Sequence, residues 1–173
     1  MNFFKYDIKI DNTGIFIIVS NSKRTRVWAE IYLNRLKSNL LEVKKRSNGA
    51  KIMAVVKANA YGHGAEDISR YIEDNELADA FAVASIDEAI SLRENGLSQD
   101  ILILGHTFEE DYDKLFTYNL IQEVDSLSYA EALDRSGYGP IRVHVAIDTG
   151  MGRIGFREAG EAEQAQTLLQ QYG

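Results

Sequence analysis

From residue 27 onward, short apolar stretches alternate regularly with longer amphipathic segments, and this rhythm restricts the fold strongly. Stretches rich in β-branched residues are typical of strands, and the longer segments between them have room for helices. A strand-helix alternation of this kind indicates an α/β protein with a parallel sheet. The last five predicted strands begin 28, 21, 19 and 21 residues apart, and the full set is Val27–Leu33, Ile52–Val56, Ala80–Ala84, Ile101–Leu104, Leu120–Val124 and Ile141–Ile147.

Local signals mark the ends of the predicted helices. Apolar residues at helical spacing predict a first helix that is capped by Asn34 and ends at Asn48-Gly49. Three later helices are predicted from capping boxes, in which a hydroxyl residue precedes a carboxylate by three positions. These boxes are Ser85 with Glu88, Thr107 with Glu110, and Ser128 with Glu131.

A closed barrel and an open doubly wound sheet both satisfy this alternation. None of the first five predicted strands is followed by a Gly-x-Gly-x-x-Gly turn, which makes a dinucleotide-binding open sheet less favoured. A complete barrel of eight strands takes about 250 residues, whereas this chain offers five or six strands. The sequence therefore predicts an incomplete (β/α)8 barrel over residues 27–173.

Residues 1–26 differ from the rest and are predicted to form an amino-terminal extension. Near-alternation from Phe3 to Ile10, the turn residues Asn12-Thr13-Gly14 and the apolar run Ile15–Val19 indicate a small hairpin. A basic stretch follows, which we interpret as a solvated linker. It comprises Lys23, Arg24 and Arg26.

Charge and composition exclude several classes of function. The net charge of −7 argues against nucleic-acid binding, which needs a basic surface. Without cysteine the chain can build neither a disulfide framework nor a thiolate metal site. Its apolar runs near the start are far shorter than the ~20 residues of a membrane helix, and no signal peptide is recognisable. We therefore expect a cytoplasmic protein with a small-molecule partner and no membrane span.

Lys57 follows a predicted strand directly, and this is where parallel barrels build their active sites. A lysine buried there is costly unless it is paired, neutralised or used covalently, as in a Schiff base with a carbonyl. The alternative is a strand that ends one residue earlier and a side chain that reaches solvent. Tyr61 offers a hydroxyl donor close by, and the glycines on either side of His63 allow close approach of a ligand.

Residues 54–64, Ala-Val-Val-Lys-Ala-Asn-Ala-Tyr-Gly-His-Gly, resemble the pyridoxal-phosphate signature of alanine racemases. The resemblance implies that Lys57 forms the covalent link to pyridoxal 5'-phosphate and then acts as one of two catalytic bases. It also implies that Tyr61 contacts the cofactor phosphate. For His63 we favour local hydrogen bonds within a turn over a catalytic role.

Residues 148–155, Asp-Thr-Gly-Met-Gly-Arg-Ile-Gly, follow the last predicted strand and are similar to a second hallmark of that family. The resemblance implies that Arg153 binds the phenolic oxygen of the cofactor and the substrate carboxylate. On its own, the loop would also allow an arginine paired with a surface carboxylate such as Glu158. Many members carry a lysine where this chain has Ala146, so another group must orient Arg153.

His106 and His144 lack metal-ligand spacing and are interpreted as structural, and no metal site is predicted.

By this resemblance the chain is an amino-acid racemase, an isomerase that interconverts L- and D-alanine and thereby supplies D-alanine for peptidoglycan. Serine racemases of the vancomycin-resistance type are an alternative. A non-catalytic pyridoxal-phosphate-binding protein or an inactive fragment is an alternative of another class. The family is expected to form homodimers, and its carboxyl-terminal β-domain, which supplies the second catalytic base, has no counterpart in these residues. We accordingly expect little or no racemase activity from the 173 residues alone.

Overall fold

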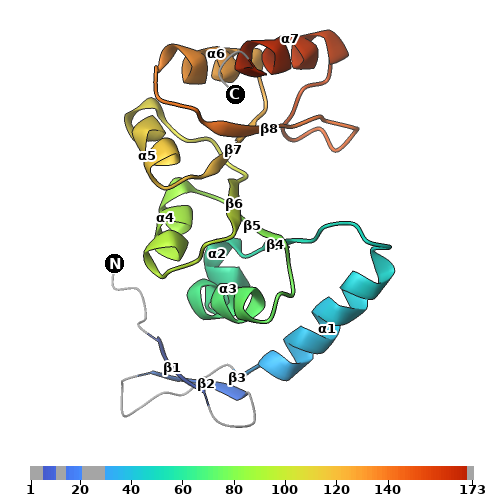
Figure 1. Ribbon diagram of the computed structural model, residues 1–173, viewed down its shortest axis with the longest axis vertical. Helices are drawn as coiled ribbons and strands as arrows, with labels where there is room; N and C mark the ends of the chain where they lie inside the picture. The colour runs from blue at the N-terminus through green and yellow to red at the C-terminus, as the bar shows by residue number, and fades with distance from the viewer. Residues whose placement is uncertain (1–5, 11–14, 21–29, 171–173) are drawn as a thin grey trace.

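A five-stranded parallel sheet organises the computed structural model, which describes residues 6–10, 15–20 and 30–170. Its strands are hydrogen-bonded in chain order, and each connection carries one or more helices (Figure 1). This confirms five of the six predicted strands to within two residues at either end. They are β4 (Met53–Val55), β5 (Ala80–Val83), β6 (Asp100–Ile103), β7 (Ile121–Val124) and β8 (Arg142–Val145).

The helices follow the strands as the amphipathic segments predict. Their apolar residues recur at helical spacing and bury one face, as Ile68 and Ile72 do in α3. In the view of Figure 1, α4 and α5 lie along one side of the sheet, and α6 packs beside α7 at its far end. The helices are α1 (Leu33–Arg46), α2 (Lys57–Gly62), α3 (Ala65–Asp74), α4 (Ile86–Glu94), η1 (Glu109–Asp111), α5 (Tyr112–Thr117), α6 (Leu127–Arg135) and α7 (Ala159–Gln170).

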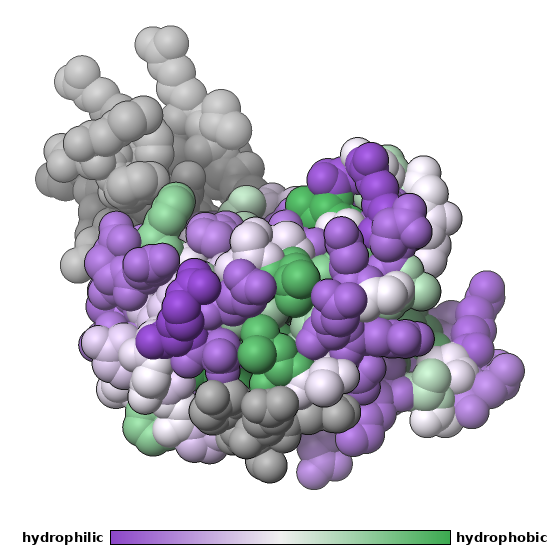
Figure 2. Space-filling view, turned by 90° about the horizontal axis from the view of Figure 1, so that it is seen from above, coloured by the Kyte–Doolittle hydropathy of each residue, from purple (hydrophilic) through white to green (hydrophobic). Residues whose placement is uncertain are grey.

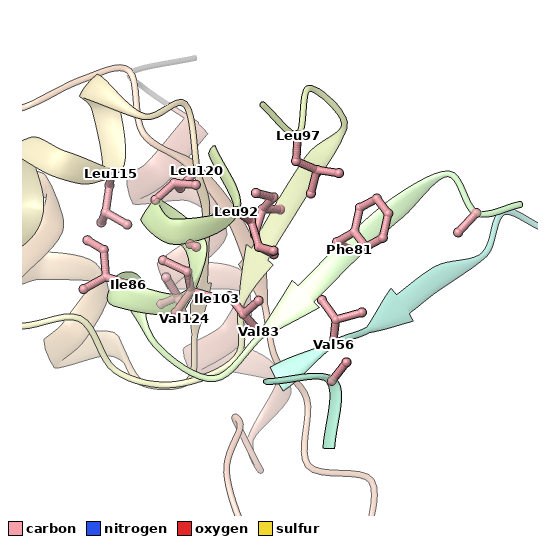
Figure 3. Close-up of a cluster of buried hydrophobic side chains, with 14 of the residues drawn as sticks. Val56, Phe81, Val83, Ile86, Leu92, Leu97, Ile103, Leu115, Leu120 and Val124 are labelled. Atoms are coloured by element: carbon pink, nitrogen blue, oxygen red, sulfur yellow. The ribbon is translucent and has the colours of Figure 1, made fainter. Parts of the chain in front are cut away.

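The main hydrophobic core lies between the sheet and these helices. Alternate residues of a strand face opposite sides of the sheet, and in β5, β6 and β7 those on the helix side are fully buried. Figure 3 shows Val83, Ile103 and Val124 in one cluster with Ile86 of α4 and Leu115 of α5. The other side of the sheet carries only a small buried group, Ala82, Leu102 and Ile121. The core thus fixes the sheet from one side.

The predicted hairpin is confirmed, but the strand after it does not join the parallel sheet. β1 (Tyr6–Ile10) and β2 (Ile15–Ser20) pair antiparallel, and β3 (Glu30–Tyr32) pairs antiparallel with β2. β3 was expected to be the first parallel strand, so this is a correction. The hairpin is close in sequence and offers β3 a partner at a lower loop-closure cost than β4, which lies beyond α1. The predicted turn at 12–14, the basic stretch at 23–26 and the boundary at residue 26 lie outside the described residues.

One of the three predicted capping boxes marks its helix correctly. Ser85 caps α4, and its Oγ accepts from the Glu88 N–H at 3.4 Å. Helix α6 is capped by Ser126 rather than by the predicted Ser128, because the chain turns two residues earlier. Thr107 caps no helix, since its hydroxyl donates instead to a buried glutamine.

The predicted start of α1 is also wrong. Its first helical residue is Leu33 and its N-cap is Tyr32, without a side-chain cap. The Asn34 side chain accepts from the Arg35 N–H inside the helix instead. The end at Asn48-Gly49 is confirmed, because the helix stops at Arg46 and both later residues have positive φ.

Figure 2 shows the surface from the end that carries α6 and α7. Hydrophobic residues gather near the middle of this face, and hydrophilic residues surround them. A groove of about 1090 Å³ runs beside β8 and α7, with Ile141, Val143 and Phe156 in its lining. Within the described ranges, no helix has the length and apolar character needed to span a membrane.

Candidate active site

The predicted site residues lie beyond the carboxyl ends of two strands of the sheet. Lys57 and Tyr61 follow β4, and Arg153 lies in the loop after β8. Three strands, β5 to β7, stand between them. With about 4.8 Å per strand step, the two strand ends would be roughly 19 Å apart on a flat sheet, and the curvature of a barrel shortens this distance.

The turn that follows Lys57 has an unusual backbone. Four consecutive residues, Ala58 to Tyr61, adopt left-handed conformations with φ between 51° and 55°. None of them is glycine, and a left-handed conformation costs other residues about 1–2 kcal/mol each. The sequence pattern did not predict this turn. Its geometry requires supporting contacts from the surrounding structure.

Hydrogen bonds inside the turn supply part of this support. The Ala60 N–H donates to the Val56 carbonyl at 2.8 Å, and the Gly64 N–H donates to the Asn59 carbonyl at 3.0 Å. The Asn59 side chain accepts from the Ala65 N–H at 2.8 Å, which ties the turn to the start of α3. The Nδ1 atom of His63 lies 2.9 Å from the Ala60 carbonyl, in agreement with the local role inferred for this histidine.

A carboxylate from another helix completes the support. Oε1 of Glu88 accepts from the Ala58 N–H at 2.7 Å, and Oε2 accepts from the Ala84 N–H at 2.8 Å. Sequence reasoning identified Glu88 only as the second residue of a capping box. The contact joins residues 30 positions apart, so no local pattern announces it.

The functional groups of Lys57 and Tyr61 are available for a ligand. Lys57 is half-buried, and Tyr61 is 62% exposed. Within the described part of the chain, neither side chain has a hydrogen-bond or ion-pair partner. β4 ends at Val55, one residue before the predicted end. This is the strand end assumed by the alternative in which the Lys57 side chain reaches solvent. An amine and a phenol without partners can bind a carbonyl group and an anion.

Asp148 organises the loop that carries Arg153. Its Oδ1 accepts from the N–H groups of Gly150 and Gly152 at 3.0 and 2.9 Å, and its Oδ2 lies 3.2 Å from Nε of Arg157. The N–H donors of Gly152 and Gly150, followed by Arg157, hold the pKa of Asp148 below its ordinary value. Asp148 therefore acts here as the acceptor that shapes the loop.

Two main-chain hydrogen bonds close the base of this loop. The Phe156 N–H donates to the Ala146 carbonyl at 2.8 Å, and the Asp148 N–H donates to the Phe156 carbonyl at 2.9 Å. Gly155 has φ of 107°, and a Cβ there would lie 2.8 Å from the Asp148 nitrogen. Glycine is therefore required at this position.

Arg153 is exposed and lines a hollow of about 520 Å³ with Glu123 and His144. The alternative pairing with Glu158 is not formed, and no ion pair of the described residues includes Arg153. Burial raises the pKa of Glu123, Asp125 raises it further, and the positive charge of Arg153 lowers it. Glu123 is thus a carboxylate that the sequence analysis missed, although its place on one face of a strand could have identified it.

The other two histidines take different positions. His106 packs against Tyr129, with ring centroids 4.2 Å apart, and against Phe108 at 5.3 Å. His144 is opposite Glu123 in the register of β7 and β8. The aromatic packing of His106 agrees with a structural role.

Comparison with known proteins gives a consistent picture. The family model described as "Alanine racemase, N-terminal domain" matches residues 31–173. An alanine racemase of Streptococcus pneumoniae strain Hungary19A-6 is 46% identical over 151 residues, which are 84% of this chain and 40% of that protein.

Solved structures agree with the sequence comparison. The structure of an alanine racemase from Clostridium difficile 630 matches with a TM-score of 0.74 and 36% identity, over 82% of this chain and 38% of that one. A histidine racemase from Leuconostoc mesenteroides also matches with a TM-score of 0.74, at 28% identity, over 80% of this chain and 38% of that one. The chain spans about 40% of the length of the curated relatives. These matches confirm the predicted fold class, an incomplete α/β barrel.

Proposed function

Because this chain belongs to the alanine racemase family, we propose that it forms the cofactor-holding part of a pyridoxal-phosphate-dependent amino-acid racemase that acts on alanine. The observation that carries the proposal is the Lys57 amine beyond the carboxyl end of β4, without a partner in the described part of the chain. The family match supports the reaction class, and the proposal extends it to particular residues.

The side chains around this edge have the chemistry that pyridoxal 5'-phosphate requires. The cofactor carries an aldehyde, a phosphate and a phenolic oxygen, and a primary amine, a phenol and a guanidinium are suitable partners for these groups. Lys57 would hold the aldehyde carbon, Tyr61 the phosphate, and Arg153 the phenolic oxygen. Arg153 would also bind the carboxylate of the substrate. When bound, the cofactor supplies the electron sink that makes the α-proton of an amino acid acidic.

In the reaction, Lys57 has a second task. With substrate bound, the Lys57 Nζ would remove or return the α-proton on one face of the substrate. Inversion requires a second base on the opposite face, a role that the proposal gives to neither Tyr61 nor Arg153. The turn of residues 58–61 supports this task by fixing the backbone next to Lys57.

The substrate, the partner and the cellular role are also proposals. Alanine is the favoured substrate because the named relatives are alanine racemases, and serine is an alternative. The match to a histidine racemase of Leuconostoc adds histidine to the amino acids to be tested. We further propose a homodimer, a cytoplasmic location and a supply of D-alanine for peptidoglycan. A non-catalytic pyridoxal-phosphate-binding protein is the alternative of another class, and the absence of turnover with any amino acid would favour it.

Borohydride reduction tests the role of Lys57. The protein at its natural length is loaded with pyridoxal phosphate and reduced, and the labelled peptide is identified by mass spectrometry. We expect the label on Lys57, its loss in K57R, and its retention in K51R, since Lys51 is an exposed lysine just before the same strand. A label on any other lysine would contradict the proposal. Turnover of alanine, serine and histidine by the same preparation then ranks the substrates.

A further inference from the structure

Glu88 has a geometry that its position in a helix does not explain. In a capping box, the carboxylate at the third helical position turns back to the N–H of the N-cap residue. Ser85 is the N-cap of α4, and its hydroxyl accepts from the Glu88 N–H as the motif requires. The Glu88 carboxylate, however, bypasses Ser85 and binds the N–H groups of Ala84 and Ala58. Only half of the box is formed, and the other half is used elsewhere.

The two N–H groups belong to the ends of neighbouring parallel strands. Ala84 comes directly after β5, and Ala58 lies three residues after the end of β4 and next to Lys57. The two oxygens, at 2.7 and 2.8 Å from their donors, therefore join the left-handed turn to the adjacent strand. Ala58 is the first left-handed residue of this turn, with φ of 51°. Its N–H donates to Glu88, so the contact lies at the point where the unusual backbone begins.

We propose that Glu88 is a positioning residue for Lys57, which fixes the entry into the left-handed turn and thereby the direction in which the lysine leaves the strand. The inference rests on the proposed function of Lys57, but the contact itself can be tested without it. A carboxylate is required, because both donors are N–H groups and both oxygens must accept. Glutamine can accept with one oxygen only, and its NH₂ group would then face the second N–H donor.

Hydrogen exchange of the unmodified protein provides the first test. Ala58 is exposed and its N–H lies outside every strand ladder, so its amide should exchange rapidly unless the Glu88 carboxylate protects it. We expect a protection factor of at least about 100 for this amide, measured by mass spectrometry on overlapping peptides across residues 54–62. Exchange of the Ala58 amide at the rate of an open chain would overturn the proposal, whatever any variant does.

The variants E88Q and D87N provide the second test. Asp87 is exposed, lies in the same first turn of α4 and carries the same charge, so D87N controls for a change in helix electrostatics. We expect at least tenfold faster exchange of Ala58 in E88Q, at least fivefold weaker binding of pyridoxal phosphate, and neither change in D87N. Equal exchange in E88Q and the unmodified protein would overturn the proposal, as would faster exchange spread evenly along α4.

Glycine at position 58 separates positioning from general stability. Glycine adopts φ of 51° without steric cost, so A58G should recover part of the cofactor affinity lost in E88Q. If Glu88 only stabilised α4, A58G would give no recovery, which would refute the positioning role. A borohydride label on a lysine other than Lys57 would instead contradict the proposed function, while the exchange of Ala58 would still report on Glu88.

Discussion

Replacing Gln122 by methionine should destabilise the protein by several kcal/mol, because this fully buried glutamine is the centre of a polar network. Its Nε2 donates to the carbonyls of Gly105 and Glu123, both at 2.8 Å, and its Oε1 accepts from the Thr107 hydroxyl at 2.7 Å. Gln122 is 0% exposed and Thr107 is 1% exposed. Methionine has a similar shape without polar atoms, so the substitution removes the hydrogen bonds and leaves the volume nearly unchanged.

The expected magnitude follows from the groups that lose their partner. The Gly105 and Glu123 carbonyls and the buried Thr107 hydroxyl would lose Gln122 as a partner, and each of these groups that stays shielded from water costs roughly 1–3 kcal/mol. We therefore expect a loss of about 2–6 kcal/mol in the free energy of unfolding. This is a large part of the 5–15 kcal/mol that is typical for proteins.

Urea unfolding followed by circular dichroism measures this loss in Q122M, T107V and the double variant. The hydroxyl and its acceptor disappear together in the double variant, so its cost should be lower than the sum of the single costs by about 1–2 kcal/mol. Q164M is the control, because Gln164 is exposed on α7 and its replacement should change stability by less than about 0.5 kcal/mol. A cost below about 1 kcal/mol for Q122M, or strictly additive costs, would refute this account of the network.

Three further predictions concern the loops and caps. The pKa of Asp148 lies below its ordinary 3.8, so its charge adds stability that is present above about pH 4 and is lost as the pH falls through the lower folded value. D148N should therefore flatten the acid side of a plot of Tm against pH. A profile parallel to that of the unmodified protein would contradict this prediction. Ser126→Ala should cost about 1 kcal/mol in urea unfolding because it removes the cap of α6, whereas Ser128→Ala should cost much less. Gly105→Ala should cost about 1–3 kcal/mol or more in the same assay, because its Cβ would lie 2.4 Å from the Ala84 carbonyl oxygen. An unchanged urea midpoint would exclude this close contact.

The regular part of the fold could be predicted because its signals are local. A buried strand such as β6 needs apolar residues on its helix side, whatever its place in the sheet. It therefore stands out in the sequence as a short apolar run. The same reasoning failed for β3, since its sequence suits a strand without specifying the partner strand. Pairing of β3 with the hairpin follows from the short loop between β2 and β3, which an apolar pattern does not encode.

The candidate site could be predicted only in part. Lys57, Tyr61 and Arg153 were identified through family resemblance, and their roles stay predictions. The contacts that support their loops were missed, because Glu88 and Asp148 act through backbone N–H groups, which every residue except proline carries. Thr107 was misassigned for a similar reason. Its hydroxyl suits both a helix cap and a buried hydrogen bond, and only the position of Gln122 in the folded chain decides between them.

Ala84 connects the Glu88 contact at the lysine turn with the hydrogen-bond network of Gln122. Its N–H is held by Glu88, which also holds the turn beside Lys57. Its carbonyl oxygen lies so close to Gly105 that no Cβ fits between them, and the Gly105 carbonyl accepts from Gln122. A loss of the Gln122 network would therefore shift the loop after β6 relative to the end of β5. Through Glu88, this shift would reach the turn of residues 58–61 beside Lys57. Since closely packed backbone segments transmit such shifts, Q122M should also accelerate exchange of the Ala58 amide, and it should do so less in E88Q, where the link is already cut.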